Sequence, residues 1–161
     1  MLRIQYASDL HLEMSDNSRY LKEHPLQVAG DVLVLAGDVA YLGEDYTKHP
    51  FWDWAADNYR QVAVLPGNHE FYGGFDLDTM HDGWRLTIRP NVVCHYNASV
   101  VIDDTELILT PLWSAIGIIE AMQVQMGVND FRQIRCGDKP LDWVRFNEEH
   151  YRCFHFLHER I

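Results

Sequence analysis

The stretch Val32-Leu33-Val34-Leu35-Ala36-Gly37-Asp38 indicates the fold, because five apolar residues end at a glycine and a carboxylate. A continuous apolar run of this length is typical of a strand covered on both faces in a parallel sheet. Two similar runs flank it: residues 3–7 lead into Asp9, and residues 62–65 are stopped by Pro66. In open α/β sheets, ligands bind at the carboxyl ends of such strands. We therefore expect the polar residues that follow the three strands to lie together.

The segments between these strands have helical character over residues 17–23 and 51–58. Strands that alternate with helices indicate a parallel α/β sheet with right-handed crossovers. A further helix is expected over residues 76–88, followed by an antiparallel extension. The strands of that extension are expected at residues 91–95, 99–102 and 106–110, with Asp103 and Asp104 in the turn between the last two.

The tail of the chain is predicted to be one helix over residues 142–161, because bulky residues recur there at helical spacing. The face expected to pack is formed by Trp143, Phe146, His150, Phe154, Leu157 and Ile161. No closing strand follows this helix in the sequence.

Composition limits the function classes. The chain has 161 residues, 47% of them hydrophobic, which suits one domain with its own core. The net charge of −11 disfavours nucleic-acid binding, since that affinity depends largely on Lys and Arg. Cys94, Cys136 and Cys153 form no Cys-x-x-Cys pair, so we expect reduced thiols in a cytoplasmic protein. No apolar run approaches the roughly 20 residues that a membrane span needs, and no signal peptide is evident.

Asp9 and His11 follow the first predicted strand directly. In an extended segment, residues i and i+2 point to the same side, so a carboxylate oxygen and an imidazole nitrogen can bind one ion. The alternative is an ordinary turn at the end of a strand with an exposed histidine. For an isolated Asp-x-His tripeptide, this alternative is the commoner one.

Asp38 follows Gly37 at the end of the second predicted strand. Gly37 lets the backbone turn or approach a neighbour closely, since glycine has no Cβ. The two oxygens of a carboxylate can each contact a different metal ion, which makes Asp38 a candidate bridging ligand. Taken alone, Asp38 fits equally well as a residue that caps the next helix.

The loop after the third predicted strand reads Gly67-Asn68-His69-Glu70. Asn68 offers a neutral carbonyl oxygen as a ligand. Histidine changes its charge near neutral pH, so His69 can donate a proton there. Glu70 is a candidate for orienting the backbone or a neighbouring side chain. The alternative is a polar loop stabilised by its own side-chain hydrogen bonds.

Together, the three clusters resemble the calcineurin-like metallophosphoesterase superfamily, in which they occur in the same order at strand ends. Two later segments, Pro111–Ser114 and Asn129–Arg135, look like those of its small bacterial single-domain phosphohydrolases. The resemblance implies an α/β fold in which two β-sheets pack face to face as a sandwich with helices outside (αββα). It also implies a metal-dependent phosphoric ester hydrolase that acts on a small phosphoester.

The resemblance further implies a centre with two divalent ions, and Mn, Fe, Zn and Co all suit mixed nitrogen and oxygen ligands. Asp9 and His11 would bind the first ion. Asp38 would bridge both ions, and Asn68 would bind the second. His69 would be the general acid for the leaving oxygen, while a metal-activated hydroxide attacks phosphorus. Asp38 and His69 are thus the predicted catalytic residues, and Asn68 and His69 the predicted substrate contacts.

The resemblance is incomplete, because the family supplies later histidines from a strand end and from a Gly-His-x-His motif, and this chain has neither. His155 and His158 share one face of the tail helix, but its aromatic character favours packed or solvated histidines. The chain therefore resembles the N-terminal part of the family only, a single domain over residues 1–161 that lacks its C-terminal portion. A complete site would hold two ions, and we expect one or none here.

Three explanations stay open: a fragment of a longer enzyme, a weak or inert short form that serves as a metal-binding, regulatory or interaction module, or a site completed by a second copy. A missing half-sheet would leave an unpaired edge and an apolar face, which favours a homodimer. Which acid orients His69 also stays open, because the segment Gly37–Tyr41 lacks a second aspartate. Aromatic residues that are candidates for lining the cleft, or else for the core, are Tyr41, Phe71, Tyr72, Trp113 and Phe131.

Overall fold

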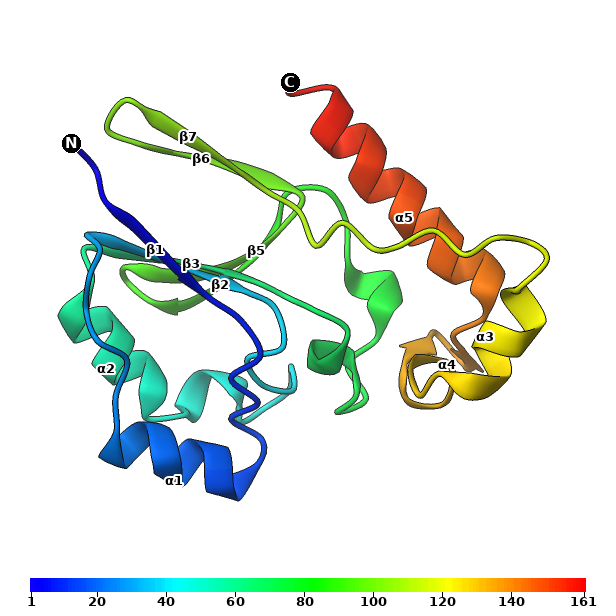
Figure 1. Cartoon of the computed structure of the whole chain (residues 1–161), viewed down its shortest axis with the longest axis horizontal. Coiled ribbons are helices and arrows are strands. Elements are labelled where there is room, and N and C mark those ends of the chain that lie inside the picture. Colours follow the sequence, from blue (N-terminus) through cyan, green and yellow to red (C-terminus); the bar gives the residue numbers. More distant parts are fainter.

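The computed structural model describes all 161 residues and has a five-stranded main sheet (Figure 1). Its strand order is β1-β2-β3-β5-β4, and the strands span Ile4–Ala7, Val32–Ala36, Gln61–Leu65, Val92–Tyr96 and Trp84–Arg89 in that order. The first four strands are parallel, and β4 pairs with β5 in the antiparallel sense. The predicted parallel α/β sheet is therefore confirmed.

The two faces of the main sheet are covered to different extents. Leu33 and Leu35 project from one face of β2 and are fully buried. Val34 lies between them, projects to the other face and is half-buried. Its neighbour in the register, Tyr6 of β1, is 81% exposed, and Ile4 on the same face is 42% exposed. The edge of this second face at β1 thus carries uncovered apolar side chains.

Two helices predicted from the sequence are present, α1 (Ser15–Glu23) and α2 (Phe51–Asn58). Helix α2 follows the short helix η1 (Tyr46–Lys48) and buries Phe51, Trp52 and Ala55. Both α1 and α2 lie on one side of the main sheet (Figure 1). None of the helices combines the length and the apolar character that a bilayer span requires.

The prediction of a helix over residues 76–88 is wrong. This segment contains only the short helix η3 (Leu77–Thr79) and then strand β4. Trp84, Leu86 and Ile88 alternate with polar residues, which is the period of a strand, and Gly83 adopts a φ of +80° just before them. The next segment, β5, also joins the main sheet through β3 instead of extending it separately.

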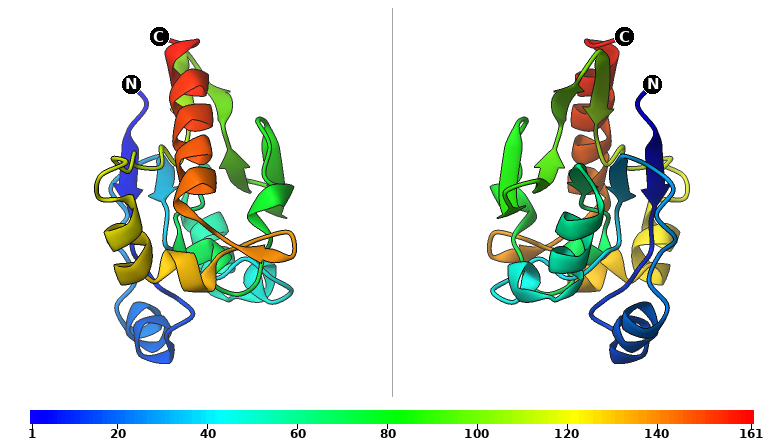
Figure 2. Two further views of the ribbon diagram at one scale, coloured as in Figure 1. Left: turned by 90° about the vertical axis from the view of Figure 1, so that its right-hand side faces the viewer. Right: turned by 90° about the vertical axis from the view of Figure 1, so that its left-hand side faces the viewer.

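The expected antiparallel pair is present as the hairpin of β6 (Ala98–Ile102) and β7 (Thr105–Leu109), which forms a sheet of its own. Asp103 in its turn has a φ of +57°, a conformation that aspartate tolerates better than most residues. The hairpin and the C-terminal helix α5 (Trp143–His158) lie on the side of the main sheet opposite to α1 and α2 (Figure 1). The end of α5 lies beside the hairpin (Figure 2).

Short elements connect β7 to α5. They are α3 (Ala121–Gly127), α4 (Asp130–Gln133), β8 (Arg135–Cys136) and β9 (Lys139–Pro140). Asp142 caps the N-terminus of α5, since its Oδ1 accepts a hydrogen bond of 2.8 Å from the Arg145 N–H.

The face of α5 that packs differs from the predicted one. Its buried residues are Phe146, Glu149, Cys153 and Phe156, whereas Phe154 is 48% exposed. Only Phe146 of the expected face is therefore fully inside. The prediction followed the bulky apolar residues and could not anticipate a buried Glu149.

Glu149 is buried because it has three partners. Arg145 lies 2.5 Å and Arg152 2.6 Å from its carboxylate oxygens, and the Tyr96 hydroxyl donates a hydrogen bond to it. Tyr96 is the last residue of β5, so this cluster ties α5 to the main sheet. Burial raises the pKa of Tyr96 well above its ordinary value, which keeps the phenol protonated as a donor.

Replacing Glu149 by alanine should lower the free energy of unfolding by about 3–5 kcal/mol, because two half-buried guanidinium groups lose their counter-charge. Glu148→Ala is the matched control, since Glu148 is the neighbouring residue with a 63% exposed side chain. The control should change stability by less than about 0.5 kcal/mol. Urea denaturation of the three proteins measures both values, and equal effects would contradict the anchoring role of Glu149.

Candidate metal centre

The loop after β1 lies against the loop after β2 through three backbone hydrogen bonds. The Asp9 N–H donates to Gly37 O at 3.1 Å, and the His11 N–H donates to Asp38 O at 3.0 Å. Leu12 continues the series with a bond of 2.8 Å to Val39 O. The sheet thus extends its pairing beyond the strand ends and aligns the residues predicted to bind metal.

Asp9, His11 and Asp38 all have left-handed backbone conformations, with φ values of 57°, 47° and 56°. Such values are uncommon for residues other than glycine and concentrate at functional sites. The expectation that Asp9 and His11 share a side because their segment is extended is therefore wrong. Their side chains meet because the backbone turns at each of them.

The structure brings the ligand atoms of Asp9, His11 and Asp38 within 4.8 Å of one another. One imidazole nitrogen and two carboxylates are a suitable donor set for a divalent first-row metal. Asp9 is exposed, while His11 and Asp38 are half-buried, so the set is accessible from solvent. These three residues fit a divalent cation by donor chemistry and by their proximity.

The loop after β3 packs closely on Asp38. A Cβ on Gly67 would lie 2.9 Å from the Asp38 backbone nitrogen and 3.0 Å from its Cγ, with Oδ1 closer still. Only glycine fits at such a distance. The His69 N–H donates to Asp38 Oδ1 at 3.1 Å, which orients the carboxylate.

Glu70 joins the loops after β2 and β3 from inside. Its carboxylate is fully buried and accepts hydrogen bonds from the backbone N–H groups of Gly67 (2.6 Å), Asp38 (3.0 Å) and Val39 (2.7 Å). Burial raises the pKa of Glu70 to about 7, and the backbone donors oppose this shift. The expectation that Glu70 orients the backbone is confirmed.

Asn68 is oriented by a residue from a distant part of the chain. Its Nδ2 donates to Asp130 Oδ1 at 2.8 Å and to the Tyr72 hydroxyl at 3.3 Å, and that hydroxyl donates to Asp130 in turn. Burial, and then Asp130, raise the pKa of Tyr72 above its ordinary value, so the phenol stays a donor. With Nδ2 engaged by Asp130, the carbonyl oxygen of Asn68 has no protein donor and remains a candidate ligand.

Sequence reasoning did not identify Asp130 as a site residue. The segment Asn129–Arg135 resembled the family, but the resemblance assigned no role within it. Asp130 is 7% exposed, and it lies at the start of α4, 62 residues after Asn68. A buried aspartate becomes recognisable only when the fold supplies its partners.

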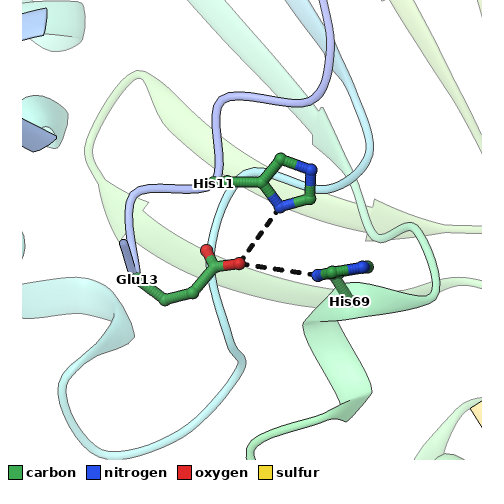
Figure 3. A group of neighbouring side chains, drawn as sticks. All are labelled: His11, Glu13 and His69. Atoms are coloured by element: carbon green, nitrogen blue, oxygen red, sulfur yellow. Dashed lines mark hydrogen bonds and ion pairs between the residues drawn. The ribbon is translucent and has the colours of Figure 1, made fainter. Parts of the chain in front are cut away.

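His69 lies between aromatic rings and a carboxylate. Its ring stacks on Tyr72 with centroids 4.3 Å apart and meets the His11 ring edge-on at 4.5 Å. Its Nδ1 lies 3.5 Å from Oε1 of Glu13, which is also 3.1 Å from the His11 Nδ1 (Figure 3). Glu13 is a second residue that the sequence interpretation did not include.

A cavity of about 390 Å³ opens beside these residues. Asp9, Asp38, Asn68 and Asp130 line one part of it, and the segment 111–114 lines another. Among the aromatic candidates, Trp113 lines the cavity and Tyr72 and Tyr41 lie beside the His69 ring, whereas Phe71 and Phe131 belong to the core. No group of converging metal-ligand residues includes His155 or His158.

The comparison with known families agrees with this geometry. Residues 2–140 match the model of the family described as calcineurin-like phosphoesterase. The chain belongs to the calcineurin-like phosphoesterase family.

The chain spans about half to three fifths of the length of two similar proteins. It is 27% identical over 147 residues to uncharacterized protein L509 of Acanthamoeba polyphaga mimivirus, a match that covers 82% of this chain and 51% of L509. It is also similar to the crystal structure of phosphopantetheinyl hydrolase (PptH) from Mycobacterium tuberculosis, with a TM-score of 0.59 and 17% identity. That match covers 98% of this chain and 62% of PptH. The structural likeness shows a shared mixed α/β fold with a central sheet flanked by helices.

Replacing Glu70 by glutamine should lower the free energy of unfolding by about 2–4 kcal/mol, because the amide NH₂ faces backbone donors and leaves a buried N–H unpaired. Glu44→Gln is the matched control, since Glu44 is exposed in the loop after β2. Thermal and urea unfolding of both variants measure the difference. A Glu70→Gln protein as stable as the control would contradict the joining role of the carboxylate.

Proposed function

We propose that this chain takes part in the metal-dependent hydrolysis of small phosphoric esters. The convergence of Asp9, His11 and Asp38 beside His69 carries the proposal, since it joins a cation-binding donor set to a proton-transfer group. Membership of a phosphoesterase family supports the reaction class. The acidic surface of the whole chain, with a net charge of −11, favours a small ester over a nucleic acid.

The charge of the cavity supports a metal-dependent reaction. Three of its lining residues are the aspartates Asp9, Asp38 and Asp130. An anionic phosphoester would be repelled by this set of carboxylates, whereas a bound divalent cation would reverse the local field. Mn, Fe, Zn and Co are all compatible with the donors.

The residues of the centre would have different roles in the proposed reaction. Asp9, His11 and Asp38 would hold one divalent ion, which supplies Lewis-acid polarisation of the phosphoryl group and acidifies water. His69 would donate a proton to the leaving oxygen. Asn68, with its amide held by Asp130, would present its carbonyl oxygen toward a second ion or the substrate.

A second candidate function follows from the ligand count. A second ion would have only Asp38 and Asn68 as protein ligands among the predicted residues, so it would be held weakly. A chain that retains one ion without turnover would act as a metal-binding or regulatory module. Elemental analysis after dialysis distinguishes the two functions: two ions favour the hydrolase, and one ion without activity favours the module.

Asp38→Asn and His69→Ala should have different effects on metal and turnover. Asp38→Asn should abolish stable Mn²⁺ binding, because it removes the charge of the predicted bridging ligand. His69→Ala should retain the metal and slow the hydrolysis of phenyl phosphate or diphenyl phosphate by about 10²–10⁴-fold, because their leaving groups need a proton. Calorimetric Mn²⁺ titration and steady-state rates measure the two effects.

Asp57→Asn is the control, since Asp57 is exposed on α2 and should leave both properties unchanged. Equal loss of metal in the Asp38 and His69 variants would contradict the assigned roles. A metal-loaded protein that hydrolyses neither ester would contradict the proposed hydrolase.

A further inference from the structure

Glu13 is a nearly buried carboxylate whose ionic partners are two imidazoles. It lies two residues after His11, and its side chain is 11% exposed. Oε1 lies 3.1 Å from Nδ1 of His11 and 3.5 Å from Nδ1 of His69 (Figure 3). No Lys or Arg forms an ion pair with Glu13, and its other oxygen, Oε2, is buried without a hydrogen-bond partner. A buried carboxylate of this kind needs hydrogen-bond donors, and the two imidazole rings are placed to supply them.

The contact with His11 determines which of its ring nitrogens is available. When Nδ1 carries the hydrogen and donates it to Glu13, the lone pair of Nε2 is left for a cation. Carboxylates that accept the second N–H of a ligating histidine fix its tautomer and raise its basicity. Glu13 thus prepares His11 to bind metal together with Asp9 and Asp38.

Glu13 faces His69 in the same way, through the Nδ1 atom of the imidazole ring. The Nδ1 of His69 is buried and has no hydrogen-bond partner, and the acceptor that lies nearest in line is the Glu13 oxygen at 3.5 Å. The stacked Tyr72 ring restrains the imidazole plane from one side. With Nδ1 directed at Glu13, Nε2 is the nitrogen left to exchange a proton with a leaving group.

We propose that Glu13 is a positioning residue. Its single carboxylate orients both the metal ligand His11 and the proton donor His69. The proposal rests on the function proposed above, and it supplies an orienting acid for His69 that the sequence pattern after Gly37 lacks. The competing role is direct ligation, because the ligand atoms of His11, Glu13 and His69 also lie within 4.8 Å of one another. The two roles differ in the number of ions bound.

The test compares Glu13→Gln, which keeps the shape and removes the charge, with Glu23→Gln, a control at the exposed end of α1. In calorimetric titration with Mn²⁺, Glu13→Gln should weaken affinity by about 10–100-fold and leave the number of ions unchanged. The control should match the unaltered protein. Loss of one ion per chain in Glu13→Gln would overturn positioning in favour of ligation, and unchanged affinity would overturn the link to His11.

The link to His69 is tested at saturating Mn²⁺ with two esters. Phenyl phosphate has a poor leaving group that needs a proton, whereas p-nitrophenyl phosphate does not. Glu13→Gln should lower kcat for phenyl phosphate by about 10²-fold, and for p-nitrophenyl phosphate by less than about tenfold. In the His69→Ala background, Glu13→Gln should not lower kcat for phenyl phosphate further relative to kcat for p-nitrophenyl phosphate. An equal loss of kcat for both esters would overturn this link. So would fully additive effects of Glu13→Gln and His69→Ala on kcat for phenyl phosphate.

The Mn²⁺ titration and the comparison of two esters together distinguish a failure of this proposal from a failure of the proposed function. If the unaltered protein hydrolyses neither ester, the hydrolase is contradicted, and the Mn²⁺ titration still decides the role of Glu13 toward His11. Should Glu13→Gln not fold, Glu13→Asp keeps the charge on a side chain shorter by one methylene. That variant should bind Mn²⁺ more weakly than the unaltered protein, and unchanged affinity would again overturn the proposal.

Discussion

The buried carboxylate of Glu70 is the constraint on which the arrangement of the centre depends. It accepts backbone hydrogen bonds from Gly67 on its own loop and from Asp38 and Val39 on the neighbouring one. Each of these N–H groups would cost about 1–3 kcal/mol if it were left buried and unpaired. The carboxylate therefore holds the two loops together and fixes the relative positions of Asp38, Asn68 and His69.

Backbone strain is concentrated at the same place. Asp9, His11 and Asp38 each have a left-handed conformation that costs on the order of 1–3 kcal/mol. The backbone hydrogen bonds between the loops after β1 and β2 offset part of this cost. The turned backbone at these residues brings one imidazole and two carboxylates within 4.8 Å of one another.

Much of the fold could be read from the sequence, because apolar runs that end at glycine or proline are local signals. The first three strands and their parallel arrangement, the helix at residues 51–58 and the candidate ligands were recognisable in this way. The strand at residues 84–89 was mistaken for a helix, although its apolar residues alternate. The packed face of α5 was missed since Glu149 is buried by arginine and tyrosine partners. Glu13 and Asp130 were not predicted as site residues, because their partners are brought together only by the tertiary structure.

The long separation between Asn68 and Asp130 has a consequence for how the chain reaches its native state. The loops that carry Asp9, Asp38 and His69 connect strands that are neighbours in sequence, so their closure costs little chain entropy. The bond from Asn68 to Asp130 instead spans 62 residues. Contacts of such separation raise the contact order of the chain, which is associated with slower folding. The proximity of Asp9, His11 and Asp38 thus requires only the N-terminal strands and their loops, whereas the orientation of the Asn68 amide also requires the C-terminal part of the chain.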